Sequence, residues 1–329
     1  MKDQAFDAFV VEETADRQYR GSVKNVRIQD LPQGEVLIRV RYSSLNYKDA
    51  LSASGNKGVT RNYPHTPGID AAGIVAESST PDIAAGDPVI VTSYDLGMNT
   101  AGGFGQYIRV PADWVVPLPD GLTLEESMIL GTAGFTAAMS VEKIADIPPH
   151  TGPVLVTGAT GGVGSLAVAI LAKRGYTVAA VSGKPETDFL SQLGASEIIP
   201  RQTFVEDNKA PILKARWAGV IDTVGGDILA TAIKSTRAWG KVTCCGLVAS
   251  PELPITVFPF ILRGVSLYGI DSQHYPKEPR QALWKKLAHE WKPDNLEKMA
   301  SRIFLDQLNP AIENMLKGRL KGRTVVDLT

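Results

Sequence analysis

The chain contains little cysteine. Its 329 residues include two, Cys244 and Cys245, and they are adjacent. Neighbouring side chains on a strand point to opposite faces, so this pair can form neither a disulfide framework nor a four-cysteine zinc site. An excess of one charge is also absent, because 34 Lys and Arg oppose 35 Asp and Glu. Nucleic acid or an anionic membrane as main partner would favour a basic face, so neither is expected.

Long apolar runs are absent as well. No window approaches the roughly 18 consecutive apolar residues of a membrane helix. The longest candidate, residues 128–141, is interrupted by glycine, threonine and serine. The first residues lack the apolar core of a signal peptide. The sequence therefore predicts a cytoplasmic protein without a membrane span.

Glycine is what the chain has in excess, at 31 of 329 residues against an average near 7%. The glycines cluster in Val154-Leu155-Val156-Thr157-Gly158-Ala159-Thr160-Gly161-Gly162-Val163-Gly164-Ser165, between an apolar strand and a helix. Aligned as A-x-G-x-x-G, Ala159 replaces the first glycine, Gly161 lets the backbone approach a pyrophosphate, and Gly164 lets the helix pack on the strand. This pattern predicts a dinucleotide with its phosphates on the helix N-terminus. The alternative is a glycine-rich turn without a ligand.

The next predicted strand, residues 176–181, indicates which dinucleotide. NAD sites usually carry an acid about 20 residues after the glycines, but here the strand ends in Ser182-Gly183-Lys184. Ser182 can donate to a 2′-phosphate, and Lys184 and Arg201 can supply charge. We therefore expect NADPH, unless both cations are merely solvated surface charges.

The pattern of elements predicts an α/β protein of two parts. Turn signals and short strands occupy the first 120 residues, where Val36, Ile38, Val40 and Tyr42 alternate as in a half-buried strand of a barrel-like β domain. Thr123-Leu124-Glu125-Glu126 has the spacing of a helix capping box. From residue 153 apolar strands alternate with helices at 165–174 and 186–193, which implies a doubly wound parallel sheet.

The last part of the chain changes pattern again. Helices are expected at 279–291 and at 310–317, the second with Asn309 as cap and Gly318 as its end. A final strand at 324–328 is expected to return to the N-terminal domain.

Several motifs together resemble the medium-chain dehydrogenase/reductase superfamily, and more narrowly its zinc-free acryloyl-CoA reductase and quinone oxidoreductase branch. They are Ser43-Ser44-Leu45-Asn46-Tyr47-Lys48-Asp49-Ala50-Leu51, Pro67-Gly68-Ile69-Asp70-Ala71-Ala72-Gly73, Gly131-Thr132-Ala133-Gly134-Phe135-Thr136-Ala137, the glycine loop, Ile221-Asp222-Thr223-Val224-Gly225-Gly226 and Phe258-Pro259-Phe260-Ile261-Leu262-Arg263-Gly264. The resemblance implies a GroES-like catalytic domain, at 1–123 and 266–329, around a Rossmann domain at 124–265. It also implies a homodimer, for which the apolar stretch at 253–270 is suited.

Zinc-containing members of that superfamily have Gly-His-Glu where this chain has Gly68-Ile69-Asp70. Ile69 cannot ligate a metal, and no cysteine precedes residue 244. We therefore expect no metal site and no zinc-assisted alcohol oxidation. Without a Lewis acid to polarise a carbonyl, the chemistry suits a small substrate that is already activated, such as an enone, an enoyl thioester or a quinone.

The resemblance also implies site residues. Tyr47 would lie beside the cofactor, with Asn46 and Asp49 shaping the catalytic site. Cofactor contacts would come from Tyr47, Thr160, Gly161, Gly162, Val163, Ser182, Gly183, Lys184, Arg201, Leu247, Ile261 and Ser272. Hydride transfer to a β-carbon would be followed by protonation of the α-carbon, from Tyr47 or from water. Tyr47 has a reference pKa near 10 and would need tuning as a donor; otherwise it only walls the pocket.

A basic run ends the chain, with Lys317, Arg319, Lys321 and Arg323. It either attracts the phosphates of a CoA-linked substrate or is a solvated face. Arg323 starts the last strand and is the expected substrate contact in the cleft. Three functions remain open: NADPH-dependent reduction of acryloyl-CoA to propanoyl-CoA, NADPH-dependent reduction of a quinone, and binding of NADPH without turnover as a sensor or structural protein.

Overall fold

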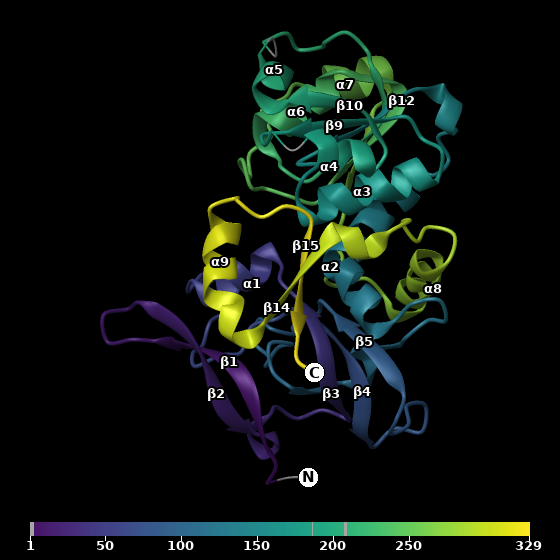
Figure 1. Cartoon of the computed structure of the whole chain (residues 1–329). Coiled ribbons are helices and arrows are strands. Elements are labelled where there is room, and N and C mark those ends of the chain that lie inside the picture. Colours follow the sequence, from purple (N-terminus) through teal and green to yellow (C-terminus); the bar gives the residue numbers. More distant parts are fainter. Residues whose placement is uncertain (1–2, 186, 207–208) are drawn as a thin grey trace. The chain divides into compact units, whose positions relative to one another are not determined.

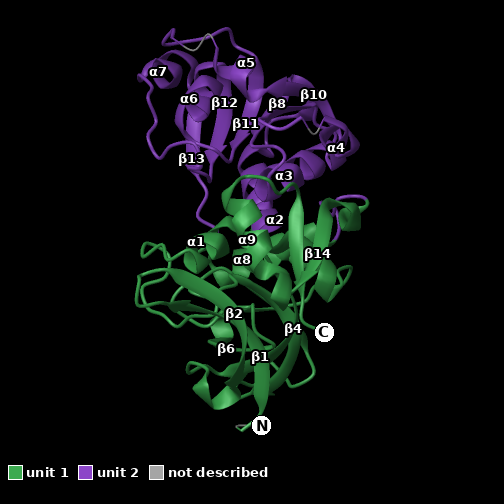
Figure 2. Cartoon of the chain, turned by 60° about the vertical axis from the view of Figure 1, so that its left-hand side comes forward, with its two compact units in different colours: residues 1–132, 273–288, 295–329 green, residues 133–272, 289–294 purple. Residues whose placement is uncertain are grey.

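The protein is described by a computed structural model over residues 3–185, 187–206 and 209–329. It divides into two compact units (Figure 2). Unit 1 comprises Met1–Thr132, Gln273–Ala288 and Asn295–Thr329, and unit 2 comprises Ala133–Ser272 and His289–Asp294. The sequence-based boundaries stand at 123 and 265, whereas the units divide after Thr132 and after Ser272, and His289–Asp294 belongs to unit 2. The first division falls inside a helix, at a kink where Gly131 has φ 52° and ψ −157°.

Unit 2 is built on a parallel sheet (Figure 1) with the order β10-β9-β8-β11-β12-β13. Its strands are β8 (Val154–Thr157), β9 (Val178–Ser182), β10 (Ala195–Pro200), β11 (Trp217–Asp222), β12 (Thr236–Cys244) and β13 (Ser266–Gly269). The first strand in the chain, β8, lies in the middle, so the direction of winding reverses between β8 and β11. In such sheets ligands bind outside the carboxyl ends of the strands at this reversal.

Helices cover both faces of this sheet, as right-handed crossovers require. They are α3 (Gly162–Lys173), α4 (Thr187–Gln192), α5 (Arg201–Val205), α6 (Gly226–Lys234) and α7 (Phe258–Arg263). The helix expected at 165–174 starts earlier, at Gly162, because the last glycines of the loop belong to its first turn. Of the helix expected at 186–193, residue 186 lies outside the described residues, and the rest agrees with α4.

Unit 1 centres on a mostly antiparallel sheet with the order β14-β15-β3-β4-β5-β7, and β6 also pairs with β3. Its strands, together with a separate β1–β2 hairpin, are β1 (Ala5–Glu13), β2 (Tyr19–Arg27), β3 (Val36–Ser44), β4 (Asp70–Ser78), β5 (Pro88–Thr92), β6 (Tyr107–Val110), β7 (Val115–Pro117), β14 (Ala300–Phe304) and β15 (Arg323–Asp327). The expected return of the last strand is confirmed, because β15 pairs antiparallel with β3, with Val325 opposite Ser44.

The alternation in strand β3 predicts a half-buried strand, but both of its faces are covered. Val36, Ile38 and Val40 face the main core of unit 1. Leu37, on the opposite face, is buried against Phe6 and other side chains of the hairpin strand β1. The hairpin therefore covers a second face of β3, and a pattern of alternation cannot reveal a cover that comes from another part of the chain.

The helices of unit 1 are α1 (Tyr47–Ala53), the start of α2 (Leu124–Ile144), α8 (Lys277–Ala288) and α9 (Leu308–Leu316). Short 3-10 turns occupy Ile28–Asp30, Ala112–Trp114, Leu296–Met299 and Leu305–Gln307 in unit 1, and Pro149–Thr151 in unit 2. The capping box before α2 is confirmed, since the Glu126 N–H donates to Thr123 Oγ1 and the Thr123 N–H to Glu126 Oε2.

The expected cap of α9 is wrong. The helix begins two residues before Pro310, and Asn309 instead donates from Nδ2 to the carbonyl oxygen of Gly21. Gly318 ends it in the left-handed region, with φ +65°. None of the described helices is long and apolar enough to cross a membrane.

Candidate functional site

The glycine loop of unit 2 turns sharply from β8 into α3. Gly158 has a positive φ of +59°, so the tight turn of this loop is at Gly158. The alignment predicts it one residue later, at Ala159. A Cβ atom on Gly164 would lie 2.3 Å from the Gly158 carbonyl oxygen, in agreement with the packing role expected for this glycine. Gly161 is the N-cap of α3, and the helix N-terminus has backbone N–H groups able to meet an anion.

The end of the neighbouring strand β11 reinforces this loop. Thr157 Oγ1 donates to Asp222 Oδ1 at 2.6 Å, and the Gly225 N–H donates to Asp222 Oδ2 at 2.8 Å. Burial raises the pKa of Asp222. Asp222 was missed as a site residue, although a polar residue that ends a buried parallel strand marks the ligand edge of such a sheet.

The predicted phosphate-binding residues come together at the end of β9. Pro200 pairs with Ser182 across the sheet, which brings Arg201 beside this strand end. The Arg201 guanidinium carbon lies 2.9 Å from where a Cβ of Gly183 would be. Ser182 Oγ accepts from the Lys184 N–H at 3.0 Å and lies 3.4 Å from Thr160 Oγ1 of the glycine loop. The hydroxyls and the cation thus lie beside the first turn of the dinucleotide fingerprint.

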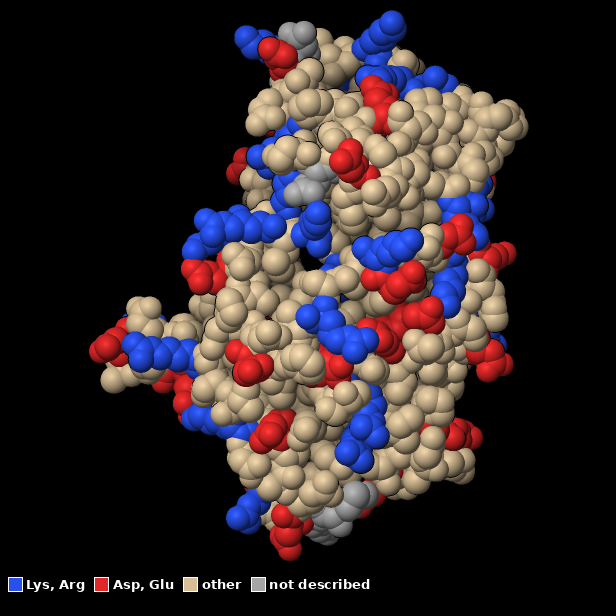
Figure 3. All heavy atoms as spheres, in the orientation of Figure 1, with Lys and Arg blue, Asp and Glu red and all other residues tan. Residues whose placement is uncertain are grey.

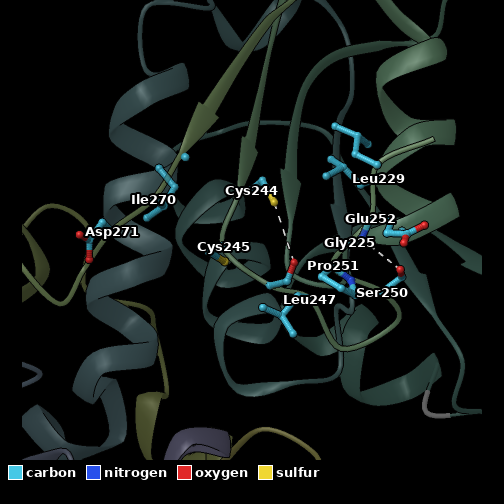
Figure 4. A pocket seen from close by; sticks show the side chains of 14 residues that line it. Gly225, Leu229, Cys244, Cys245, Leu247, Ser250, Pro251, Glu252, Ile270 and Asp271 are labelled. Atoms are coloured by element: carbon cyan, nitrogen blue, oxygen red, sulfur yellow. Dashed lines mark hydrogen bonds between the residues drawn. The ribbon is translucent and has the colours of Figure 1, made fainter. Parts of the chain in front are cut away.

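A pocket of about 550 Å³ lies at the carboxyl ends of β11, β12 and β13 (Figure 4). Leu247, a predicted cofactor contact that is 65% exposed, lines it together with Ile270. Cys244 and Cys245 also line it, and burial raises the pKa of both thiols. Its Cys244 thiol donates to the Gly246 carbonyl oxygen.

Two other predicted cofactor residues lie elsewhere in unit 2. Ile261 is on α7 and is 67% exposed, and it does not line this pocket. Ser272 accepts at Oγ from Thr136 Oγ1 of α2, at 2.9 Å. These observations do not connect Ile261 or Ser272 with the glycine loop, so the cofactor roles of both residues stay predictions.

In unit 1, Asn46 and Asp49 start α1. The Asp49 carboxylate accepts from the Asn46 N–H at 2.8 Å and from the Ile69 N–H at 2.8 Å, and its side chain is fully buried. Asn46 donates from Nδ2 to Asp70 Oδ2 at 2.8 Å. Burial first, and then the Asp70 charge, raises the pKa of Asp49 from 3.8 to about 7. Asp49 therefore positions both the helix start and the loop at Gly68 and Ile69.

Asp70, the first residue of β4, is the centre of this buried cluster and was not predicted as a site residue. Ser44 Oγ donates to it at 2.6 Å, and Thr132 donates to it from both N–H and Oγ1. A Cβ on Gly131 would lie 2.5 Å from Asp70 Oδ2, so this kink in α2 must be glycine. Asp70 and Gly131 stand in motifs that carry the family resemblance, the only signal that could have found them.

Arg323 has a different place from the one expected. Its side chain is 3% exposed, and it donates to the Ile129 carbonyl oxygen at 2.8 Å, to Ser44 Oγ at 2.9 Å and to Asn46 Oδ1 at 3.2 Å. Its Nη2 lies 3.9 Å from Asp70 Oδ2. Arg323 is therefore an internal member of this cluster, and the expectation that it is the substrate's phosphate contact is wrong.

Tyr47 is the first residue of α1, next to the buried cluster, and its side chain is 41% exposed. Its phenol is thus available to a ligand, unlike the carboxylates beside it.

Among the residues that the structure describes, no group of three or more His, Cys, Asp or Glu side chains is placed to hold a metal ion.

These features define a class of protein. A parallel sheet with this strand order, a glycine turn that opens a helix and polar groups after the second strand form a dinucleotide-binding α/β fold, here attached to a β-rich unit with a buried polar cluster.

Comparison with known proteins agrees with that class. Residues 162–289 match the family model of zinc-binding dehydrogenases, and residues 32–120 match that of the alcohol dehydrogenase GroES-like domain. The chain is 46% identical to the putative quinone oxidoreductase YhfP of Bacillus subtilis, over 98% of this chain and 99% of the relative. It is 45% identical to the acrylyl-CoA reductase AcuI of Ruegeria pomeroyi, with the same coverage.

Solved structures are similarly close. The YhfP structure with NAD bound has a TM-score of 0.96 and covers 99% of this chain and 100% of that one, at 45% identity. The yhdH oxidoreductase of Salmonella enterica in complex with NADP has a TM-score of 0.95 and covers 98% and 100%, at 41% identity. The chain belongs to the medium-chain dehydrogenase/reductase superfamily, as an NAD(P)-dependent oxidoreductase of the branch that includes AcuI and YhfP.

Proposed function

We propose that this chain is an NADPH-dependent reductase of activated carbon–carbon double bonds, which converts acryloyl-CoA to propanoyl-CoA without zinc. The observation that carries the proposal is the group formed by Ser182, Lys184 and Arg201 beside the glycine loop. A 45% identical relative over nearly its whole length is an acrylyl-CoA reductase, which supports the choice of substrate.

The preference for NADPH follows from the chemistry at the end of β9. An NAD site places an acid there for the ribose 2′-hydroxyl, whereas this strand ends in a serine and a lysine, with the Arg201 guanidinium against Gly183. Hydroxyl and cationic donors bind a phosphate and would leave the uncharged ribose of NADH with fewer partners. A relative's structure with NADP and another's with NAD show that this branch accommodates both.

The chain's own residues have distinct tasks in this proposal. The N–H groups at the start of α3 hold the pyrophosphate, and the pocket at Leu247 receives the other end of the dinucleotide. Bound NADPH would supply a hydride to the β-carbon of the enoyl thioester. Asn46 and Asp49 hold the start of α1 in place, so that Tyr47 keeps a defined position.

The α-carbon must then gain a proton. The Tyr47 phenol, which is partly exposed, and water are the two sources that fit. The Tyr47→Phe variant separates them: if kcat stays near the wild-type value the donor is water, and if kcat falls by a factor of about 100 or more the phenol acts as general acid.

The test of the function is an absorbance assay of NADPH oxidation with acryloyl-CoA, crotonyl-CoA and a panel of quinones, repeated with NADH. We expect acryloyl-CoA with NADPH to give the highest kcat/KM. Quinone reduction is the second candidate, because YhfP, 46% identical, is described as a putative quinone oxidoreductase. A higher kcat/KM for a quinone would replace the proposal with this candidate, and binding of NADPH with no acceptor turned over would reject both.

We also propose a homodimer formed through β13, the last strand in the order of its sheet. Large apolar side chains near this edge are exposed: Trp239 is 81% exposed, Ile261 67% and Leu262 65%. An open strand edge with such side chains favours pairing with a second copy. Light scattering after size-exclusion chromatography at micromolar concentration tests this proposal, and a monomeric mass would contradict it.

A further inference from the structure

The loop between α9 and β15 is a strongly charged part of the unit 1 surface. Lys317, Arg319 and Lys321 are all exposed there, and Figure 3 shows Lys and Arg atoms gathered where Figure 1 draws this loop. We propose that this basic loop, residues 317–322, binds the phosphate groups of the CoA part of the substrate. The inference rests on the acyl-CoA substrate proposed above.

The position of the basic loop follows from the pairing of β15 with β3. The Leu45 N–H donates to the Thr324 carbonyl oxygen at 2.9 Å, and Arg323 Nη1 donates to Asn46 Oδ1 at 3.2 Å. The loop therefore joins the sheet beside the segment that leads into α1 and Tyr47. Six residues of chain span at most about 20 Å, so the Cα atoms of all three residues lie within that distance of the Arg323 Cα atom. A flexible pantetheine arm can join a thioester near Tyr47 to phosphates at the loop.

The basic loop is anchored at both ends. At its start the Gly318 N–H donates to the Met315 carbonyl oxygen and the Arg319 N–H to that of Asn314, both at 2.9 Å, on the last turn of α9. At its end the Arg323 side chain is buried in the polar cluster. Gly318 and Gly322 have φ of +65° and +62°, which turns the backbone sharply on either side of Arg319 and Lys321. An anchored loop loses less conformational freedom when it binds a ligand than a loose tail does.

The charge of the basic loop fits several phosphates. Lys317 forms an ion pair with Glu313 one helical turn earlier, and this lowers the pKa of that carboxyl. Arg319 adds to the same effect on Glu313. Lys317, Arg319 and Lys321 place three exposed cations within five residues, in a chain whose net charge is −1. The diphosphate and 3′-phosphate of CoA are multiply charged anions, and guanidinium and ammonium groups are the side chains that bind them.

The experiment compares two thioesters with the same acyl group, acryloyl-CoA and acryloyl-pantetheine, at saturating NADPH. In the triple variant Lys317→Gln, Arg319→Gln, Lys321→Gln we expect KM for acryloyl-CoA to rise about tenfold, at roughly a few-fold per exposed charge. We expect kcat, KM for acryloyl-pantetheine and KM for NADPH to stay unchanged. The matched control is Arg17→Gln, Arg20→Gln, Arg27→Gln in the β1–β2 hairpin, which removes three exposed cations from the same unit. This control should keep the wild-type KM for acryloyl-CoA.

A direct binding measurement separates the basic loop from the proposed function. Calorimetric titration of wild-type protein with CoA, which carries the phosphates but no acceptor, should give binding that the triple variant weakens by the same factor. If the wild type reduces acryloyl-CoA and the triple variant keeps its KM, the inference is overturned and the function stands. If no acryloyl thioester is reduced but CoA binding depends on the loop, the function is rejected, and only the binding of CoA phosphates by the loop is supported. An equal loss of affinity for CoA in the hairpin control would also overturn the inference. The overall positive charge of unit 1, and not the basic loop, would then determine the affinity.

Discussion

The two polar regions of this molecule use the same kinds of groups in opposite ways. At the ligand edge of unit 2 the donors are backbone N–H groups, a serine and the exposed Arg201, and they are placed to meet an anion. In the polar cluster of unit 1, Asp49, Asp70 and Arg323 are at most 3% exposed and bond to one another's neighbours. The first region leaves donors for a ligand. The second uses its donors internally, so its effect on function passes through the position of Asn46 and Tyr47.

Removing the cation of the buried cluster should have the largest effect. Arg323→Met leaves Asp70 and Asp49 without their buried positive neighbour, so we expect the free energy of unfolding to fall by about 3–5 kcal/mol. Urea denaturation followed by circular dichroism measures this loss. Arg319→Met, an exposed arginine in the basic loop, is the control and should change the value by less than about 0.5 kcal/mol. Equal losses in both variants would show that burial does not distinguish the two arginines.

A pair of glycine substitutions separates packing from binding in the glycine loop. Gly164→Ala brings a Cβ 2.3 Å from the Gly158 carbonyl oxygen, and the overpacking should cost about 1–3 kcal/mol of unfolding free energy. Gly161→Ser introduces a good N-cap residue whose Cβ would lie 3.3 Å from the Gly158 carbonyl oxygen, so stability should change by less than about 0.5 kcal/mol.

NADPH binding, measured by fluorescence titration, should nevertheless weaken in Gly161→Ser, because the backbone there is predicted to approach the pyrophosphate. Wild-type affinity in this variant would remove Gly161 from the cofactor site. Unchanged stability of Gly164→Ala would show that α3 can move away from the loop.

Two cations of unit 2, the half-buried Lys184 and the exposed Arg201, should control cofactor choice. In Lys184→Ala, Arg201→Ala we expect KM for NADPH to rise by about 10- to 100-fold, since a hydrogen bond to a charged group contributes about 1.5–3 kcal/mol. KM for NADH should not change, because NADH has no 2′-phosphate. Steady-state kinetics with each cofactor measures both, and Lys214→Ala, an exposed lysine of the same unit, is the control. A parallel rise for NADPH and NADH would place the two cations at another part of the dinucleotide.

The last prediction concerns Asp49 and the change of the unfolding free energy with pH, which is small for each pH unit. Burial and the Asp70 charge raise its pKa from 3.8 to about 7, so between these pH values the folded chain holds a proton that the unfolded chain has released. This contribution to stability falls as pH rises through that interval and is absent above it. Relative to Asp49→Asn, the wild-type unfolding free energy should fall by up to about 1.4 kcal/mol per pH unit. Urea denaturation at pH 5, 6 and 8 measures it, and parallel pH profiles would show that Asp49 is ionised throughout.

The glycine loop and the unit 2 sheet were predictable because their signals are local. A strand, a turn and a helix follow one another within residues 154–173, and each burial pattern is continuous. The tight turn was assigned one residue too late, since a run with glycine at 158, 161, 162 and 164 permits more than one alignment.

The polar cluster was predictable only in part. Asn46 and Asp49 are three residues apart and form a capping box, and a family motif contains both. Their partners lie far along the chain: Thr132 is 62 positions from Asp70, and Arg323 is 277 positions from Asn46. Arg323 follows the cations at 317–321 in sequence and resembles them. It is nevertheless the first residue of the buried strand β15, two positions after Lys321.

The amino-acid sequence by itself determined the classes of structure: a parallel dinucleotide-binding sheet and a β-rich second part that the last strand completes. It also contains the serine and the two cations that we propose bind a 2′-phosphate. The classes of structure follow from hydrophobic periodicity and turn chemistry, which act between near neighbours. Only the tertiary structure decided which charges are buried. The same guanidinium is a surface donor or an internal one depending on whether β15 pairs with β3 and brings Ser44, Asn46 and Asp70 around it. Burial depends on chain segments that meet in space, and no local pattern contains them.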